Sequence, residues 1–363
     1  MSVYGFIGLG LIGGSIARAI REKQPDAYLM AYDINFGAVE DALSEHVVDE
    51  HALTIGESFR SCDVIFLCAP VQKNDENLAE VARFIKPDAL ITDVGSVKTP
   101  IFEAIESAGL NSSFVGGHPM AGSERVGFAA SKASLLQNAY YILTPAPETP
   151  SEKLEFMKDL VSSLGAIPLV LSPAEHDYVV AGISHLPHVI AYTLVNLVRN
   201  KDNEDGIMKM VAAGGFKDIT RIASSSASMW EQICLTNSEN ILPLLRSYIE
   251  SLQDMEKKIS GGDEKSLLDE FEQARVYRDS FVTAGSGPIK VSYDITIDIA
   301  DEPGALAAIA TILALNGISI KNIGILHNRE YLGGDLRIEF YDEESVTRGT
   351  TILESKGYTV HHK

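Results

Sequence analysis

Short runs of apolar residues alternate with stretches of helical periodicity along the first half of the chain. The apolar runs have the length of buried strands and lie at Val3–Ile7, Tyr28–Tyr32, Val64–Cys68, Leu90–Asp93, Phe114–Gly116 and Tyr140–Leu143. A Pro-rich segment, Thr144–Pro150, indicates a surface loop before one more helix and the strand Ile167–Leu171. Because strands and helices alternate, residues 1–171 are predicted to form an α/β domain with a mostly parallel, doubly wound sheet.

The hydrophobic pattern changes near Ser172 and then keeps helical spacing to about residue 283. Three long segments carry it, at His176–Asn200, Asn237–Ile259 and Glu264–Phe281. Residues 172–283 are therefore predicted to form an all-α domain. Few strands remain to cover its apolar surface, so we expect that surface to form the seam of a homodimer.

A small α+β module is predicted over residues 289–363, after a Gly-rich linker at Ala284–Pro288. Alternating polar and apolar positions in Val291–Ala300 indicate a strand, and the apolar helix that follows ends at Asn316 and Gly317. Two strands come next, at Ile318–Leu326 and Asp335–Tyr341. A helix and a short strand that ends at His361 follow them. The predicted order is β-α-β-β-α-β.

The composition is that of a globular protein, but a net charge of −20 and a pI near 4.8 narrow the choice of partners. Nucleic acids and anionic lipid surfaces require a basic face, so neither is expected as a partner. The three cysteines show no paired spacing, which is typical of reduced thiols. No apolar run is long and uninterrupted enough to suggest a membrane span. The early apolar segment lacks a basic n-region, so we expect a cytoplasmic protein.

A Gly-rich motif follows the first predicted strand and opens a helix. It runs through Gly8, Leu9, Gly10, Leu11, Ile12 and Gly13, and the helix continues from Gly14 to Lys23. Glycines in such a motif allow a tight turn and let a pyrophosphate approach the helix N-terminus. Asp33, at the end of the next strand, would accept hydrogen bonds from a ribose 2′-hydroxyl and would repel a 2′-phosphate. No arginine follows at the next two positions, so NAD is favoured over NADP as the cofactor. Ala69 and Pro70 either line the cofactor cleft or merely end a strand.

Two further segments follow predicted strands at the carboxyl edge of the sheet, where open α/β folds bind ligands. The first runs from Asp93 to Lys98 and the second from Gly116 to Glu124. The imidazole of His118 suits a general base near neutral pH, although a loop histidine can also be purely structural. Ser96 either hydrogen-bonds the same substrate oxygen or orients the imidazole, and the alternative to both is a serine that simply forms a turn or caps a helix.

The helical region carries three more candidates for substrate binding. His185 and His188 are three positions apart, so they share a helix face. Nothing near them completes a metal-ligand set, so no metal is expected, and substrate contact is favoured with packing as the alternative for His185. Arg221 offers the guanidinium fork that matches a carboxylate, and an ordinary ion pair is its alternative.

Five segments together, beginning at Gly8, Asp93, Gly116, Ser184 and Gly214, resemble the prephenate dehydrogenase family. They read GLGLIGGS, DVGSVK, GGHPMAGSE, SHLPH and GGFKDITRIA and span roughly the first two-thirds of the chain. The last module resembles an ACT domain. The resemblance implies a Rossmann-type dinucleotide domain and oxidative decarboxylation of prephenate by NAD⁺ to 4-hydroxyphenylpyruvate, in tyrosine biosynthesis.

The resemblance also implies roles for individual residues of the catalytic part. His118, with Ser96 beside it, assists removal of the hydroxyl proton while hydride leaves the same carbon. Arg221 and His188 bind the carboxylates of the dianionic substrate. Glu124 and Lys217 shape the site or gate its entrance.

For the last module, the resemblance implies regulation by an aromatic amino acid. Tyrosine or phenylalanine would bind at a module interface near Gly304 and Asn316 and shift the enzyme between two states. The alternative is a module kept only for assembly.

Three competing functions remain open at this point. Arogenate, the amino analogue of prephenate, could be the substrate of the same scaffold. A β-hydroxyacid dehydrogenase shares the general layout but relies on a lysine in the helical domain, and the His118 segment disfavours it. A non-catalytic NAD-sensing regulator would need no base and no carboxylate clamp, so the combination of His118, Ser96 and Arg221 argues against it.

Overall fold

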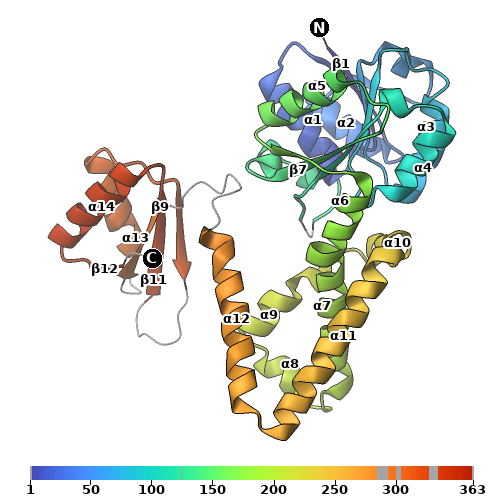
Figure 1. Ribbon diagram of the computed structural model, residues 1–363. Coiled ribbons are helices and arrows are strands. Elements are labelled where there is room, and N and C mark those ends of the chain that lie inside the picture. Colours follow the sequence, from blue (N-terminus) through green and yellow to red (C-terminus); the bar gives the residue numbers. More distant parts are fainter. Residues whose placement is uncertain (1, 124, 284–292, 300–303, 327–333, 362–363) are drawn as a thin grey trace. The chain divides into compact units, whose positions relative to one another are not determined.

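The computed structural model describes residues 2–123, 125–283, 293–299, 304–326 and 334–361 (Figure 1). The chain divides into two compact units, residues 1–270 and residues 271–363. The first holds the α/β sheets and most of the helical region, and the second holds most of the last long helix and the C-terminal module.

The centre of the first unit is a five-stranded parallel sheet in the order β3-β2-β1-β4-β5. Its strands are β1 (Val3–Ile7), β2 (Tyr28–Tyr32), β3 (Glu50–His51), β4 (Val64–Leu67) and β5 (Leu90–Asp93). The chain moves outward from β1 to β3 and then returns to the other side of β1 at β4. The order reverses between β1 and β4, which places a ligand crevice at the carboxyl ends of these two strands.

A second, three-stranded sheet continues beside β5 in the order β6-β7-β8, through a parallel bridge between Ile91 and Phe114. Its strands are β6 (Val115–Pro119), β7 (Tyr140–Pro145) and β8 (Ile167–Val170); β6 and β7 are antiparallel. The prediction that the sixth strand ends at Gly116 and that His118 lies in a loop is wrong. His118 lies within β6 opposite Ile142, because backbone pairing with β7 carries the Gly-rich stretch on as a strand.

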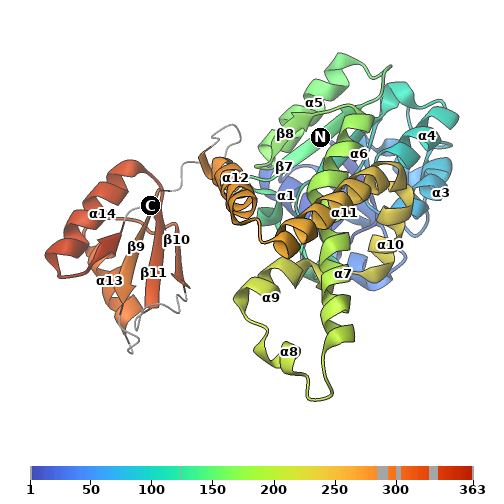
Figure 2. The same cartoon turned by 60° about the horizontal axis from the view of Figure 1, so that its bottom comes forward.

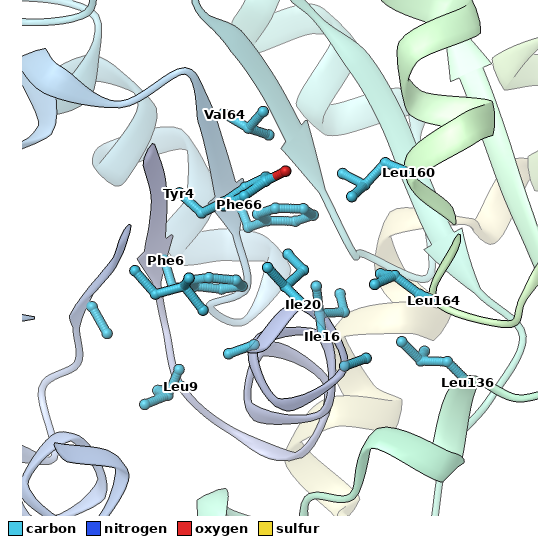
Figure 3. Close-up of a cluster of buried hydrophobic side chains, with 14 of the residues drawn as sticks. Tyr4, Phe6, Leu9, Ile16, Ile20, Val64, Phe66, Leu136, Leu160 and Leu164 are labelled. Atoms are coloured by element: carbon cyan, nitrogen blue, oxygen red, sulfur yellow. The ribbon is translucent and has the colours of Figure 1, made fainter. Parts of the chain in front are cut away.

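Helices pack on both faces of the large sheet, as predicted for a doubly wound fold. Tyr4 and Phe6 of β1 belong to one buried cluster, which includes side chains of α1 (Leu11–Lys23), α2 (Phe36–Ser44) and α5 (Ser151–Ser163). Ile7 of the same strand belongs to a second cluster with α3 (Val71–Val81) and α4 (Thr99–Ser107). In Figure 3 the rings of Phe6 and Phe66 lie in the first cluster, where their centroids are 5.0 Å apart and nearly parallel. The alternation of side chains along β1 thus builds both cores.

The helical region begins at a capped N-terminus. The Ser172 hydroxyl accepts a hydrogen bond from the Glu175 amide, and the Glu175 carboxylate accepts one from the Ser172 amide. The helices are α6 (Pro173–Val180), α7 (Leu186–Lys201), α8 (Ile207–Val211), α9 (Gly214–Thr220), α10 (Ala227–Thr236), α11 (Ser238–Gly261) and α12 (Glu264–Thr283). A π-helical turn at Ala181–His185 joins α6 to α7, and such turns often mark functional sites.

The combined stretch Pro173–Lys201 is long and apolar enough to cross a membrane by length and composition alone, with a mean hydropathy of 1.4. The sequence-based expectation that no run meets this criterion is therefore wrong. One helix of this kind is weak support for a membrane span, because core helices of water-soluble proteins meet the same criterion. Only 22% of the most apolar part of this stretch is buried within the chain. The rest is an exposed apolar surface that another molecule would need to cover.

The C-terminal module has the predicted order β-α-β-β-α-β. Its antiparallel sheet runs β10 (Asn322–Leu326), β11 (Gly334–Phe340), β9 (Tyr293–Ile299) and β12 (Val360–His361). The helices α13 (Ala305–Leu315) and α14 (Glu343–Ser355) cover one face of this sheet and share a core with it (Figure 2). Gly304, with φ +95°, precedes α13, and Asn316 follows it. At 1.5 Å per residue, the two positions are about 18 Å apart at opposite ends of one helix.

Candidate active site

The Gly-rich loop connects β1 to α1 and fits tightly against the end of β4. Gly8 has φ +96°, and a Cβ added there would lie 2.7 Å from the Ala69 backbone nitrogen. A Cβ added at Gly13 would lie 2.4 Å from the Gly8 carbonyl oxygen. Around Gly10, by contrast, nothing lies within 4 Å of an added Cβ. The loop is therefore closed on its protein side and open at Gly10, where a pyrophosphate would need to approach.

Donors and an acceptor surround this opening. Leu11, Ile12 and Gly13 form the first turn of α1, whose N–H groups lack intrahelical acceptors and favour an anion. The Asp33 carboxylate accepts hydrogen bonds from the Leu9 amide at 2.6 Å and the Asn35 amide at 2.7 Å.

These contacts hold the acidic group beside the Gly-rich loop. Asp33 is partly exposed, as is Ala69, and Pro70 is exposed just before α3. The described residues therefore fit a dinucleotide, and the ribose contact of Asp33 stays a prediction.

A buried ion pair connects the segment Asp93–Lys98 to the strand β6. The Lys98 ammonium is fully buried, pairs with Asp93 and donates a hydrogen bond to the Gly117 carbonyl oxygen at 2.7 Å. Asp93 accepts two more, from the amides of Gly95 and Gly117. Burial lowers the pKa of Lys98, and the charge of Asp93 opposes that effect.

This clamp fixes the loop that carries Ser96 relative to the strand that carries His118. Ser96 is half-buried, and among the described residues its hydroxyl has no hydrogen-bond partner. Within the described part of the chain Ser96 and His118 form no hydrogen bond with each other, and the alternative that Ser96 hydrogen-bonds the substrate stays a prediction. Lys98 and Asp93 were not predicted as site residues, although their buried ion pair fixes the geometry of this edge of the sheet.

His118 is buried and connects to two residues that the sequence analysis overlooked as site residues. Its Nδ1 lies 2.8 Å from His176 Nε2, and His176 Nδ1 lies 2.8 Å from Asp177 Oδ1. Asp177 in turn accepts hydrogen bonds from the amides of Lys98 and Thr99 and from the Thr99 hydroxyl. Burial holds the pKa of His118 well below its usual value of 6.5, so the imidazole is neutral at pH 7.

The helical region adds a second group of rings. His188 stacks on Trp230 with centroids 3.5 Å apart, and His185 meets the same indole edge-on at 5.9 Å. The two histidines thus share a face, as their spacing predicted. The Asn237 amide group donates to His185 Nδ1 and to the Asp177 carbonyl oxygen, which links this group to the His118 chain. Within the described residues, the buried indole N–H of Trp230 has no partner and could donate to a ligand.

The remaining substrate candidates lie at the periphery. Arg221 and Lys217 are exposed, in and just after α9. Burial lowers the pKa of His188, and the charge of Arg221 lowers it further, so those two side chains are electrostatic neighbours. Glu124 lies outside the described residues. The part of the chain that the structure describes holds no cluster of three or more His, Cys, Asp or Glu side chains suited to a metal ion.

A doubly wound sheet with an open Gly-rich loop, a buried neutral imidazole and a helical region against it defines a dehydrogenase of the Rossmann type. Two family models match the chain: the prephenate dehydrogenase nucleotide-binding domain over residues 16–169 and the prephenate dehydrogenase dimerization domain over residues 172–273. The chain belongs to the prephenate dehydrogenase family.

Three similar proteins illustrate this relationship. Prephenate dehydrogenase of Bacillus subtilis is 38% identical over 96% of this chain and 95% of its own length. The crystal structure of prephenate dehydrogenase from A. aeolicus in complex with hydroxyphenyl propionate and NAD⁺ is 31% identical, has a TM-score of 0.73, and covers 77% of this chain and 98% of that chain. The crystal structure of Synechocystis arogenate dehydrogenase is 30% identical and has a TM-score of 0.68. It covers 77% of this chain and 99% of that chain.

Proposed function

We propose that the chain catalyses the NAD⁺-dependent oxidative decarboxylation of prephenate to 4-hydroxyphenylpyruvate. The observation that carries this proposal is a buried imidazole, His118, kept neutral at the carboxyl edge of a sheet that also carries an open dinucleotide loop. A base that is neutral at pH 7 can accept a proton from an alcohol while hydride departs from the same carbon.

Each atom in this reaction has a destination. The C4–H bond breaks and its hydride passes to NAD⁺, while the 4-hydroxyl proton passes to His118. The bond from the ring to its carboxylate then breaks, carbon dioxide leaves, and the electron pair makes the ring aromatic. His118 returns its proton to the ring oxygen, so the enzyme ends unchanged.

Two cationic or polar groups are proposed to hold the dianionic substrate. Arg221 would bind a carboxylate, and His188, held flat against Trp230, would bind another polar group. His185 has its Nδ1 occupied by Asn237, so it would act by packing or through its other nitrogen. Lys217 and Glu124 remain candidates for the entrance of the site.

A spectrophotometric assay with NAD⁺ and prephenate tests the proposal, because NADH formation is measured directly. His118→Asn should lower kcat by about 10²- to 10⁴-fold and leave NAD⁺ affinity nearly intact. Arg221→Ala should mainly raise the KM for prephenate. Wild-type turnover in the first variant would end the role of His118 as the base, and an unchanged KM in the second would remove Arg221 from the substrate site.

Arogenate is the second candidate substrate, since one similar structure is an arogenate dehydrogenase. Arogenate carries an ammonium group on its side chain where prephenate carries a keto group. Comparing kcat/KM for prephenate and arogenate under the same conditions decides between them. A higher value for arogenate would replace the first proposal at the level of substrate and leave the hydride chemistry intact.

We further propose that the enzyme serves tyrosine biosynthesis and that an aromatic amino acid regulates it through the C-terminal module. Gly304 and Asn316 lie at opposite ends of α13, so a single small effector within one module would contact only one of them. Titration calorimetry of the full chain with tyrosine and with phenylalanine tests this. Neither heat nor inhibition from either compound would leave the module with an assembly role.

A further inference from the structure

We propose that His176 and Asp177 are positioning residues that fix the tautomer of His118 and take up part of its positive charge during proton transfer. The proposal rests on the function proposed above, because it concerns how His118 acts as a base. It adds two residues that do not touch the reacting atoms and act only through His118.

The first step is the orientation of His176. Its Nδ1 lies 2.8 Å from a carboxylate oxygen of Asp177, which can only accept, so Nδ1 must carry the hydrogen. Burial lowers the pKa of His176, which disfavours its doubly protonated form. In neutral His176, Nε2 is therefore an acceptor.

The second step is that the tautomer of His176 determines the tautomer of His118. Nε2 of His176 faces Nδ1 of His118 at 2.8 Å, and a hydrogen bond between them requires His118 to donate. Neutral His118 is then protonated at Nδ1 and bare at Nε2. A bare Nε2 is the form that can accept a proton from a substrate hydroxyl, whereas the opposite tautomer would present a hydrogen there.

Asp177 is itself held in place firmly. Three hydrogen bonds reach its carboxylate from the first turn of α4, two from the amides of Lys98 and Thr99 and one from the Thr99 hydroxyl. These donors leave one direction for His176 and keep the carboxylate charged inside the protein. The N-terminus of α4 therefore determines the tautomer of His118 indirectly, through Asp177 and His176.

The third step concerns charge. Burial disfavours an imidazolium at His118 and at His176, and the positive charge of Lys98, which lies near both histidines, disfavours it further. Asp177 and Asp93 act in the opposite sense on His176. When Nε2 of His118 takes the substrate proton, the Nδ1–H bond can break as an Nε2–H bond forms on His176. The positive charge then lies beside Asp177 and returns along the same path.

A pair of variants at His176 tests the positioning role. Phe in His176→Phe fills similar space but offers no acceptor, so kcat should fall by about 10- to 10³-fold with little change in the KM for prephenate or in NAD⁺ affinity. Gln in His176→Gln can present a carbonyl oxygen near the position of Nε2. It should therefore recover at least about tenfold of that loss. Equal activity of the two variants would overturn the proposal.

A second pair separates charge from the loss of a hydrogen bond. Asp177→Asn removes the carboxylate charge and one acceptor, whereas Thr99→Val removes only the hydroxyl that donates to Asp177. Asp177→Asn should lower kcat by at least about tenfold, and Thr99→Val should stay within about threefold of wild type. An Asp177→Asn variant no slower than Thr99→Val would contradict the charge role.

A spectroscopic measurement tests the tautomer without any substrate. The full chain has nine histidines, and ¹⁵N-histidine NMR with His118→Asn as the assignment control identifies the signals of His118. We expect a protonated Nδ1 and a bare Nε2 at pH 7 to 8. A protonated Nε2 would overturn the proposal even in an active enzyme. The expected tautomer in a chain inactive on both prephenate and arogenate would uphold the arrangement and refute the proposed function instead.

Discussion

At the scale of single residues, three buried imidazoles tie stability to pH. Burial lowers the pKa of His118, of His176 and of His185, the last to about 4. In the unfolded chain, a histidine titrates near pH 6.5. Between these values the unfolded state binds protons that the folded state does not, so the free energy of unfolding falls as the pH drops below about 6.5. For His185 alone, the loss is about 3 kcal/mol by pH 4.

Urea unfolding between pH 8 and pH 5 measures this loss. His185→Gln should flatten the acid side of the curve relative to wild type, because it removes one group that must be neutral in the folded state. His46 is exposed, and His46→Asn serves as the control with the wild-type slope expected. An identical slope in His185→Gln and wild type would show that this imidazole does not couple folding to protons.

Two glycines of the dinucleotide loop separate folding from binding. A Cβ at Gly10 meets nothing within 4 Å, whereas one at Gly13 would lie 2.4 Å from a backbone oxygen. Gly10→Ala should therefore leave the melting temperature nearly unchanged and weaken NAD⁺ binding by at least about tenfold, a cost of about 1.4 kcal/mol. Gly13→Ala should lower the melting temperature as well. Calorimetry and thermal melts measure both; unchanged NAD⁺ affinity in Gly10→Ala would place the pyrophosphate elsewhere.

At the scale of elements, the Lys98–Asp93 pair joins β5 to β6. Removing one partner of a buried pair leaves an uncompensated charge, so Lys98→Met should destabilise the chain by about 3–5 kcal/mol. Lys86 and Asp63 form a matched control, because theirs is a partly exposed pair, and Lys86→Met should cost no more than about 1 kcal/mol. Denaturant unfolding of the two variants gives the comparison. A similar small loss in both would mean that burial does not govern the strength of the pair.

The same elements show what the sequence could and could not predict. Apolar runs between turn residues were enough to locate β1, β2 and β5 with the bounds that the structure has. The pattern missed the length of β6, since Gly116 to Pro119 become a strand only through pairing with β7. His176 and Asp177 escaped because their contacts reach across 58 and 79 positions to His118 and Lys98, and nothing local marks them. The sequence therefore predicted features that depend on neighbouring residues, and it did not predict hydrogen bonds between residues far apart in the chain.

At the scale of the whole molecule, the exposed apolar side chains among the described residues include a stripe along α11. Leu242, Ile249, Leu252 and Ile259 of α11 are 45% to 64% exposed and follow one another at intervals of seven, three and seven. Such spacing places all four on the side of a helix that packs against another helix in coiled coils. In a chain with a net charge of −20, an uncharged stripe of this length is best explained by a second copy of the same helix region.

We therefore expect wild-type protein to sediment at twice the chain mass of 39.3 kDa. Leu252→Glu places a charge in the stripe and should shift the protein to the monomer, because burying an unpaired carboxylate at an interface costs several kcal/mol. Ser247→Glu adds the same charge to another face of α11 and should leave the dimer intact. Analytical ultracentrifugation at equal concentrations compares the three. A monomeric wild type, or a Leu252→Glu dimer as stable as that of Ser247→Glu, would show that α11 does not form the seam.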